Sequence, residues 1–410
     1  MASPTIQIAR VVKSVTDTQE QMVPAPPVDG VAPNRRHRIW ALPLVAVGFI
    51  ALAAVLLSSS FTASRFSSIK RPYALVPADA ESVEPRMAIT GAKRYAADGS
   101  ILFVTIREPQ LSLLSWLMVR RENDVQLMTF EDVNGSGTPQ QQSTRGRRQM
   151  VSAKQAAEYV ALSKLGYPID LKPGNIVVDQ IVCFKVNDEG TKCTEEAPSG
   201  KVLQPDDELI SIDGTPIKTL DDLRPILARH KGGDEVEVSF NRPGKSGVQK
   251  GEVELIASPD DPTRVIVGFY PFDTTEVGAA PFPVSIDTAG IGGPSAGLAF
   301  TLTLIDELTP GELTGGNRVA VTGTIDVDGK VGPIGGLAQK ASAVKQTGTK
   351  YFLVPASQSD DEIAAARAVA GNQVQIIPVG TIDEALAALT KLGGNGDRLG
   401  LPGKGFKPAS

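Results

Sequence analysis

Histidine and cysteine are scarce in this sequence of 410 residues. It has two histidines, His37 and His230, and two cysteines, Cys183 and Cys193. The zinc-binding patterns Cys-x-x-Cys and His-Glu-x-x-His are both absent, so we do not expect a metal-dependent hydrolase. Long basic stretches are missing as well, and a net charge of -5 argues against a nucleic-acid partner.

A complete phosphate-binding loop is also lacking. Gly244-Lys245-Ser246 has the end of such a loop, but Ser239 stands where its first glycine is required. The segment follows Asn241-Arg242-Pro243, which is typical of a hairpin turn. We therefore expect neither a nucleotide nor any other cofactor.

One long uncharged run is present near the N-terminus, over residues 39–61. About 20 apolar residues cross the hydrocarbon layer of a bilayer, so this run predicts one transmembrane helix. Arg35, Arg36 and Arg38 come directly before it and place the N-terminus in the cytoplasm. A cleaved signal peptide is the alternative, because Ser58 to Ser60 are small, although the apolar run is long for one.

Composition and position predict the character of the segments before and after this run. Residues 1–38 are rich in proline and polar side chains and predict a disordered cytoplasmic tail. Residues 62 onward then lie outside the membrane, where Cys183 and Cys193 can form a local disulfide; two separate thiols are the alternative. Residues 393–410, rich in glycine and lysine, predict a flexible tail.

Hydrophobic periodicity predicts the elements of the rest of the chain. Residues 134–148 are mostly Gly, Gln, Ser, Thr and Arg and predict a loop. Ser152 then caps an amphipathic helix from Ala153 to Leu165, which Gly166 ends. The remaining apolar segments predict strands over 101–106, 265–270, 282–286 and 319–325, and helices over 296–308 and 337–346.

Gly293-Pro294-Ser295-Ala296-Gly297 is the first motif with chemical content. A Gly-x-Ser-x-Gly turn is typical of α/β-hydrolases, in which a histidine follows the serine. No histidine follows Ser295 here, which excludes an esterase of that fold. Pro294 suits the first turn of a helix, so Ser295 is expected at a helix N-terminus, where N–H groups stabilise an oxyanion. A capping serine in a glycine-rich turn is the alternative.

The donors to that oxyanion are expected from Ser295, Ala296, or the glycines Gly292 and Gly293, because proline has no N–H. The base must replace histidine, and lysine is the remaining candidate. Lys340 and Lys345 border the apolar stripe of the predicted helix 337–346 on opposite sides. A lysine pressed against apolar surface loses hydration, and its pKa falls. The positions of the two lysines around the helix do not decide which of them is the base.

Residues 167–257 have the pattern of a small β-rich domain. Leu203 to Gly214 resembles the Leu-x-Pro-Gly-Asp-x-Ile-x-x-Ile-Asp-Gly pattern of bacterial PDZ domains, with Asp206 in place of one glycine. A strand is predicted over 208–212, a helix from Thr219 to about 230, and a strand over 235–240. The resemblance implies binding of an extended peptide beside a helix. A spacer that binds nothing is the alternative.

Residues 282–355 resemble the proteolytic domain of Lon-type peptidases. The family's Gly-Pro-Ser-Ala-Gly, Thr-Gly and Pro-Ile-Gly-Gly-Leu-x-x-Lys match residues 293–297, 322–323 and 333–340. The resemblance makes Ser295 the nucleophile and Lys340 the general base, with Thr322 positioning the lysine.

Two positions depart from the Lon pattern. Gly292 stands where many members carry an acid, and Thr324 stands where they carry glutamate after Thr-Gly. Both changes leave the serine and the lysine intact but bear on their electrostatic setting, and so on the rate of the reaction.

The order of anchor, PDZ domain and Lon-like domain resembles the membrane-anchored, ATP-independent Lon-like peptidases of Gram-positive bacteria. This implies an α+β Lon fold, with residues 62–166 as its extracytoplasmic N-terminal part, an inserted PDZ domain over 167–257, and a catalytic domain over 258–392. We expect an endopeptidase that cleaves polypeptides outside the membrane, with the PDZ domain binding or gating substrate. The family also implies a hexamer. An inactive membrane-tethered PDZ scaffold that binds peptide ends is the alternative.

Overall fold

The computed structural model describes residues 47–48, 51–52, 72–122, 124–135, 137–187, 190–258 and 261–399. The predicted tail 1–38 lies outside these residues, as do most of the predicted transmembrane run 39–61 and residues 400–410. Among the described residues, none of the helices combines the length and the apolar character that a membrane crossing requires. The chain separates into two compact units, Met1–Val55 and Leu56–Ser410, and the second contains all the elements that follow.

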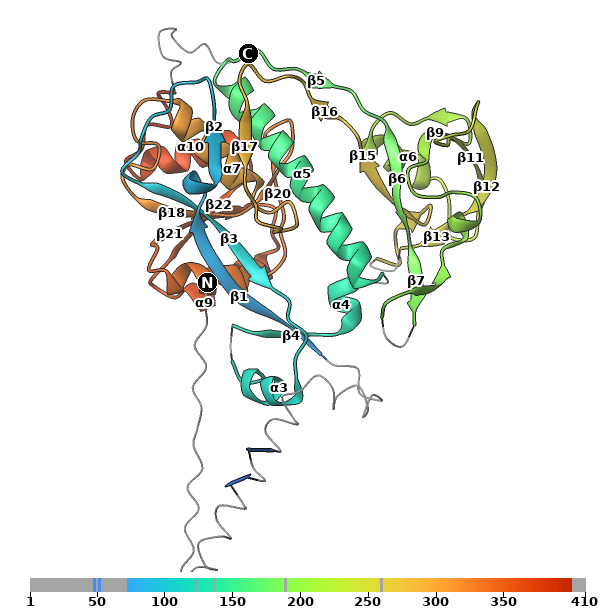
Figure 1. Ribbon diagram of the computed structural model, residues 1–410, viewed down its shortest axis with the longest axis horizontal. Coiled ribbons are helices and arrows are strands. Elements are labelled where there is room, and N and C mark those ends of the chain that lie inside the picture. Colours follow the sequence, from blue (N-terminus) through green and yellow to red (C-terminus); the bar gives the residue numbers. More distant parts are fainter. Residues whose placement is uncertain are drawn as a thin grey trace, which may run out of the picture. The chain divides into compact units, whose positions relative to one another are not determined.

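A six-stranded sheet joins segments from both ends of the second unit, in the order β22-β21-β18-β3-β1-β4 (Figure 1). Its strands are β1 (Tyr73–Ser82), β3 (Ser100–Arg107), β4 (Gln126–Met128), β18 (Arg318–Val321), β21 (Tyr351–Pro355) and β22 (Gln375–Val379). The pairs β3–β18, β18–β21 and β21–β22 are parallel, whereas β1 is antiparallel to β3 and to β4. The predicted strand 101–106 is confirmed within β3.

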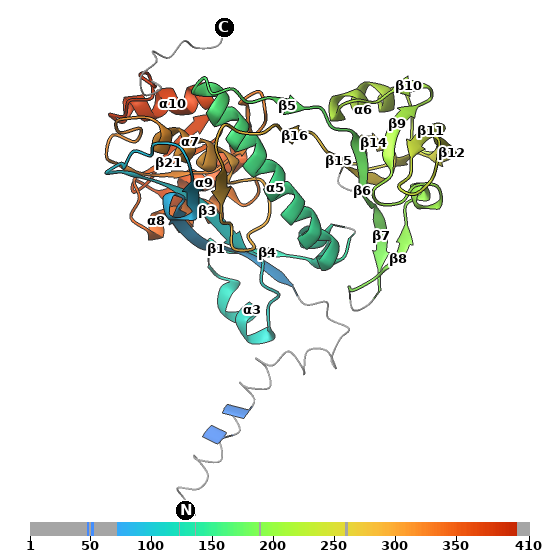
Figure 2. The same ribbon diagram turned by 45° about the horizontal axis from the view of Figure 1, so that its top comes forward.

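Helices cover both faces of this sheet. They are α5 (Pro139–Lys164), α7 (Gly297–Leu308) and α10 (Ile382–Lys391) on one face, and α8 (Leu337–Gln346) and α9 (Asp360–Ala370) on the other. The alternation of side chains along a strand explains the division. Ile101 and Phe103 pack with α5 and α7, and their neighbour Val104 packs with α8 and α9. Figure 2 shows α5 and α7 together on their face of the sheet.

Helix α5 begins much earlier than the sequence pattern predicts. The predicted loop 134–148 is wrong, and so is a helix start at Ala153, because the helix runs from Pro139. Thr138 is its N-cap and forms a capping box with Gln141. Glutamine and arginine favour helix intrinsically, so the first turns need no apolar stripe. Gly166, with a φ of +75°, follows the helix end as predicted.

Two predicted strands are interrupted by glycines with positive φ. The predicted strand 319–325 is divided into β18 and β19 (Thr324–Ile325), because Gly323 has a φ of +151°. The predicted strand 265–270 is divided into β14 (Val265–Ile266) and β15 (Phe269–Asp273) at Gly268, whose φ is +94°. Such backbone angles favour glycine and end a regular strand.

The segment between α5 and α7 forms a second sheet with its own core. Its order is β12-β11-β9-β6-β15, with β10 beside β9. The strands are β6 (Ile176–Ile181), β9 (Glu208–Ile212), β10 (Thr215–Pro216), β11 (Glu235–Asn241) and β12 (Gln249–Glu254). Helix α6 (Leu220–Leu227) starts at the predicted cap Thr219 and ends earlier than predicted. Asp206 replaces the glycine of the PDZ pattern and has a φ of +70°, a left-handed backbone angle that glycine adopts readily.

Short elements complete the unit. The structure joins Cys183 and Cys193 in a disulfide across the hairpin of β7 (Cys183–Val186) and β8 (Cys193–Glu196). Two further strands, β5 (Leu171–Lys172) and β16 (Glu276–Val277), pair where the chain enters and leaves the second sheet. The others are η1 (Glu84–Arg86), β2 (Met87–Ile89), α3 (Leu113–Val119), α4 (Phe130–Asn134), η2 (Pro198–Lys201), β13 (Ile256–Ala257), β17 (Val284–Ile286) and β20 (Val331–Gly332).

Candidate active site

Ser295 lies in the turn that connects β17 to α7. The helix begins at Gly297, with Ala296 as its N-cap. Pro294 and Ser295 therefore precede the first helical turn, whereas the sequence pattern predicted that they belong to it. Gly297 has a packing reason to be glycine, since an added Cβ would lie 2.9 Å from Cγ2 of Ile325. The serine is therefore held on a turn that packs tightly against β19.

Lys340 extends from α8 to this serine. Its Nζ lies 2.7 Å from Oγ of Ser295 and 3.1 Å from Oγ1 of Thr322, although 45 positions separate lysine and serine in the sequence. The lysine side chain is buried, with 2% of its surface exposed. The other candidate, Lys345, is exposed and donates to the carbonyl oxygen of Val369. The structure thus brings Lys340, and not Lys345, to the serine.

Burial changes the acid–base chemistry of Lys340. Loss of hydration lowers its pKa from 10.5 to about 7. In the part of the chain that the structure describes, no carboxylate forms an ion pair with this ammonium. A large fraction of the lysine is therefore uncharged at neutral pH and able to accept the serine proton.

Thr322 connects the lysine to the backbone of the serine. Its buried hydroxyl accepts from Lys340 and donates to the carbonyl oxygen of Ser295 at 3.1 Å. The N–H of Gly323 donates to the same carbonyl at 2.9 Å. The three predicted residues Ser295, Thr322 and Lys340 thus form one hydrogen-bonded group.

The backbone donors near Ser295 differ in their availability. The N–H of Gly293 donates to the carbonyl oxygen of Gly146 in α5 at 2.8 Å, which argues against its predicted role as an oxyanion donor. Within the described ranges, the N–H groups of Gly292, Ser295 and Ala296 have no hydrogen-bond partner. Ser295 and Ala296 precede helix α7, where an anion is favoured.

Gly292 meets α5 through direct backbone contact. An added Cβ on Gly292 would lie 3.2 Å from the carbonyl carbon of Gly146. This contact leaves little room for the acid that many Lon domains carry here. Sequence reasoning missed Gly146, and its only signal was a glycine within a long polar segment.

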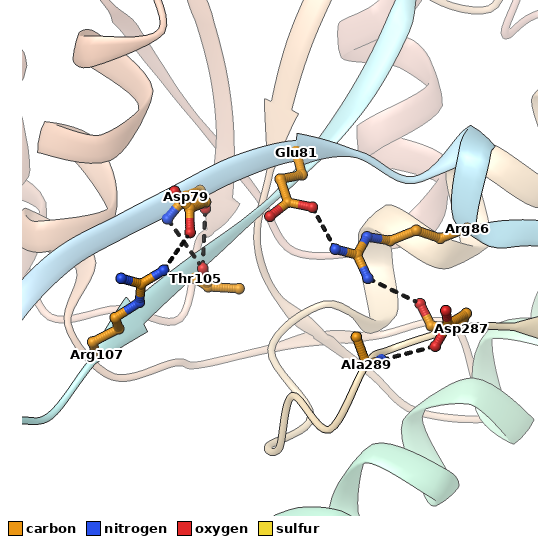
Figure 3. A network of polar contacts seen from close by, with 7 residues as sticks. All are labelled: Asp79, Glu81, Arg86, Thr105, Arg107, Asp287 and Ala289. Carbon is orange, nitrogen blue, oxygen red and sulfur yellow. Dashed lines mark hydrogen bonds and ion pairs between the residues drawn. The ribbon is translucent and has the colours of Figure 1, made fainter. Parts of the chain in front are cut away.

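Arg86 anchors the segment that leads to Ser295 (Figure 3). Its guanidinium forms an ion pair with Glu81 at the end of β1 and donates to the carbonyl oxygen of Asp287 at 3.4 Å. The carboxylate of Asp287 in turn accepts from the N–H of Ala289 at 2.9 Å, at a residue whose φ is +45°. These bonds link the turn after β17 to the sheet.

A cavity of about 610 Å³ opens in front of Ser295. It is lined by residues 103–106 of β3, residues 291–296, and residues 333–335, together with Lys340. The pairing of β3 with β18 ends at Phe103, so the edge of β3 beyond that residue faces the cavity without a strand partner among the described residues. The sequence predicted the strand but not its unpaired edge, because the point at which pairing ends depends on the length of the neighbouring strand.

Thr105, which lines the cavity, also stabilises the irregular pairing of β1 with β3. The register shifts between Pro77 and Ala80. At this bulge the Thr105 hydroxyl donates to the carbonyl oxygen of Asp79 and accepts from its N–H, at 3.1 and 3.2 Å, and Arg107 pairs with the Asp79 carboxylate (Figure 3). Glu108, which also lines the cavity, has a pKa raised by burial.

Among the described residues there is no group of three or more His, Cys, Asp or Glu side chains that could hold a metal ion.

Comparison with known proteins assigns two segments. Residues 288–391 match the family model of the Lon protease (S16) C-terminal proteolytic domain, and residues 179–255 match that of the PDZ domain. The chain is 40% identical over 94 residues to the Lon proteases of Neorickettsia sennetsu and Trichlorobacter lovleyi, and 37% identical over 93 residues to that of Chloroflexus aggregans. Each alignment covers 23% of this chain and 11% of the relative.

Among solved structures, the PDZ domain of an SdrC-like protein from Listeria monocytogenes is 17% identical and covers 24% of this chain and 90% of its own. Its TM-score of 0.19 is too low to carry an argument. The Lon match holds Ser295, Thr322 and Lys340, and the PDZ match holds β9 to β12 of the second sheet. The chain therefore contains a Lon-type proteolytic domain and a PDZ domain, which supports a serine endopeptidase of Lon type.

Proposed function

We propose that this protein is an ATP-independent endopeptidase in which Ser295 is the nucleophile and Lys340 the general base. One observation carries the proposal: a buried amine with a pKa of about 7 lies 2.7 Å from a serine hydroxyl. A lysine in this state meets the requirement for a base that works near neutral pH. The matched segment covers only a small part of the Lon proteases, so the activity is inferred from the site itself.

The reaction follows from the contacts. Neutral Lys340 takes the proton of the Ser295 hydroxyl as Oγ attacks the peptide carbonyl. The N–H groups of Ser295 and Ala296 stabilise the oxyanion, and each such donor contributes about 3 kcal/mol to lowering the barrier. Protonated Lys340 then gives its proton to the leaving amine. Water, deprotonated by the same lysine, then attacks the acyl carbonyl, and the lysine returns that proton to Oγ of Ser295 as the carboxylic acid product leaves.

The free edge of β3 suits an extended polypeptide. Residues 104–106 line the cavity and offer unpaired backbone groups beside Ser295. A peptide added there as a strand gains main-chain hydrogen bonds whatever its sequence. We therefore propose unfolded or extended polypeptides as substrates.

The PDZ domain is proposed to bind or gate these substrates. Its sheet ends at β15, which has a strand partner on one side only within the described residues. PDZ domains add an extended peptide to such an edge. By resemblance to Lon domains, we also propose a homohexamer.

The proposed location is the outer side of the cytoplasmic membrane. Residues 39–61 are uncharged and follow three arginines, which supports a single crossing with the N-terminus in the cytoplasm. The disulfide between Cys183 and Cys193 is in keeping with an oxidising compartment.

The proposal is tested with the detergent-solubilised full chain and casein as an unfolded substrate. We expect cleavage without ATP, and labelling of Ser295 by a serine-reactive phosphonate probe. Ser295→Ala should abolish both, whereas Ser285→Ala, at an exposed serine of β17, should change neither. Peptide binding by the PDZ domain without labelling or cleavage would favour the inactive scaffold.

A further inference from the structure

Helix α3 presents large apolar side chains to solvent. The helix reads Leu-Leu-Ser-Trp-Leu-Met-Val and is started by a capping box between Ser112 and Ser115. Within it, Leu117 is 43% exposed and Met118 is 66% exposed, and Leu127 in β4 is 40% exposed. Eight large apolar side chains are exposed in the described residues after Pro72, and three of them are in α3 and β4. Such a concentration on one part of the surface is typical of a binding surface.

This apolar surface lies where the described part of the second unit begins. The carbonyl oxygen of Pro72 accepts from the N–H of Leu111, two residues before α3, and Tyr73 bridges to Gln110. Tyr73 also pairs with Met128 of β4. Strand β4 and the segment that leads into α3 are therefore both hydrogen-bonded to the chain at the start of β1. Figures 1 and 2 both show α3 next to β4.

The length of chain before Pro72 limits how far this surface can lie from a membrane. Ten residues, 62–71, separate the apolar run 39–61 from Pro72. A fully extended chain covers at most ~3.6 Å per residue, so these residues reach about 35 Å. If residues 39–61 cross the bilayer, α3 is within reach of its surface.

The two arginines directly after α3 suit contact with anionic lipid headgroups. Arg120 and Arg121 follow the helix and are exposed, and the Arg120 guanidinium lies 5.2 Å from the ring centroid of Trp116. Of the acids near α3 and β4 in the sequence, Glu108, Glu122, Glu131 and Asp132 are exposed, and Asp124 accepts from the hydroxyl of Ser342. Tryptophan settles at the headgroup level of a bilayer, and arginine binds anionic headgroups.

We infer that α3 lies in the headgroup layer of the membrane that residues 39–61 cross, with Leu117 and Met118 toward the acyl chains and Trp116 at the headgroup level. The inference rests on the proposed membrane anchor. A lipid surface fits better than a second copy of the chain, because a stable protein interface buries about 800 Å² on each partner. A seven-residue helix beside a short strand offers only a small apolar area. In this arrangement α3 and the membrane anchor 39–61 together hold the protease domain at the membrane surface.

The experiment uses the full chain in vesicles of phosphatidylcholine and phosphatidylglycerol. The sequence has two tryptophans, so Trp40→Phe leaves Trp116 as the only indole reporter. Phospholipids brominated near the headgroup should reduce the Trp116 emission about twofold, as expected for an indole at that depth. A Leu117→Ser/Met118→Ser variant should lose most of this quenching. Val248→Ser, at an exposed apolar residue elsewhere, should retain it.

Casein cleavage and the circular dichroism of each variant establish that it is folded. If the chain floats with vesicles in high salt but Trp116 is not quenched, the inference is overturned and the anchor stands. If the chain does not float at all, the anchor and the inference fall together. A third outcome is a chain that forms a dimer and shows no quenching of Trp116. If the double serine variant then loses the dimer, this surface binds a second copy of the chain and the inference is overturned.

Discussion

The N–H of Gly293 donates to the carbonyl oxygen of Gly146 at 2.8 Å, two residues before the candidate nucleophile. Gly146 belongs to α5, which precedes the PDZ domain, whereas Gly293 follows that domain in the sequence. The bond therefore joins the two separated parts of the protease fold at the site itself. It also removes Gly293 from the donors that an oxyanion could use.

The pH dependence of cleavage should follow the protonation of Lys340. Since only the neutral amine accepts the serine proton, kcat/KM should rise with pH through about 7 and then level off. One unit below this pKa, the rate should be about a tenth of its maximum. Initial rates on a fluorogenic peptide measure the profile. Lys345→Ala, on the same helix, should leave it unchanged, and a flat profile for the unmodified protein would contradict the role of Lys340.

Removal of the Lys340 charge should stabilise the fold. The folded-state pKa of about 7 lies below the unfolded value of 10.5, so the unfolded chain binds the extra proton between these two values. Stability of the unmodified protein therefore rises with pH over this window. Lys340→Met should be more stable at pH 6 by about 1–4 kcal/mol, with a difference that shrinks toward pH 10.

Urea unfolding at several pH values measures this difference. Lys345→Met, at an exposed lysine, is the matched control and should show no such trend. A Lys340→Met variant that is less stable than the unmodified protein at every pH would refute the argument from burial.

Loss of the Thr322 hydroxyl should slow the reaction and leave the fold intact. Thr322→Val removes the contacts to Lys340 and to the carbonyl oxygen of Ser295, but that carbonyl keeps its bond from Gly323. We expect kcat to fall about 10- to 100-fold with little change in KM, because positioning of a base is lost. Thr322→Ser should retain most activity. Full activity in the valine variant would show that the lysine needs no such support.

A side chain at position 292 should displace the nucleophile. In Gly292→Ala the new Cβ meets the backbone of Gly146 at 3.2 Å, and neither segment is a flexible side chain. We expect a loss of about 1 kcal/mol in stability and about tenfold in rate. Thermal unfolding and peptide cleavage measure the two effects. Gly335→Ala, which meets nothing within 4 Å, should unfold like the unmodified protein, and equal stability of both variants would count against the contact.

Local patterns in the sequence predicted much of the fold. Apolar, β-branched runs indicated β3 and β9, and the capping pattern at Thr219 indicated the start of α6, because each signal depends on neighbours in the chain. The start of α5 could not be predicted in this way. Its first turns carry no apolar stripe, and the capping box at Thr138 lay in a segment without periodicity.

By itself, the sequence determined which chemistry was possible: a serine in a glycine-rich turn, no histidine after it, and two lysines on one helix. The position of the lysines on the helix left both open and the family resemblance favoured Lys340, but only the tertiary structure places Lys340 beside Ser295, because burial and hydrogen bonding depend on residues distant in the chain. Helix α8 brings Lys340 to Ser295 and Thr322, and the surrounding core removes the water that would keep the amine charged. Lys345 stays exposed on the surface, where it donates to the carbonyl oxygen of Val369.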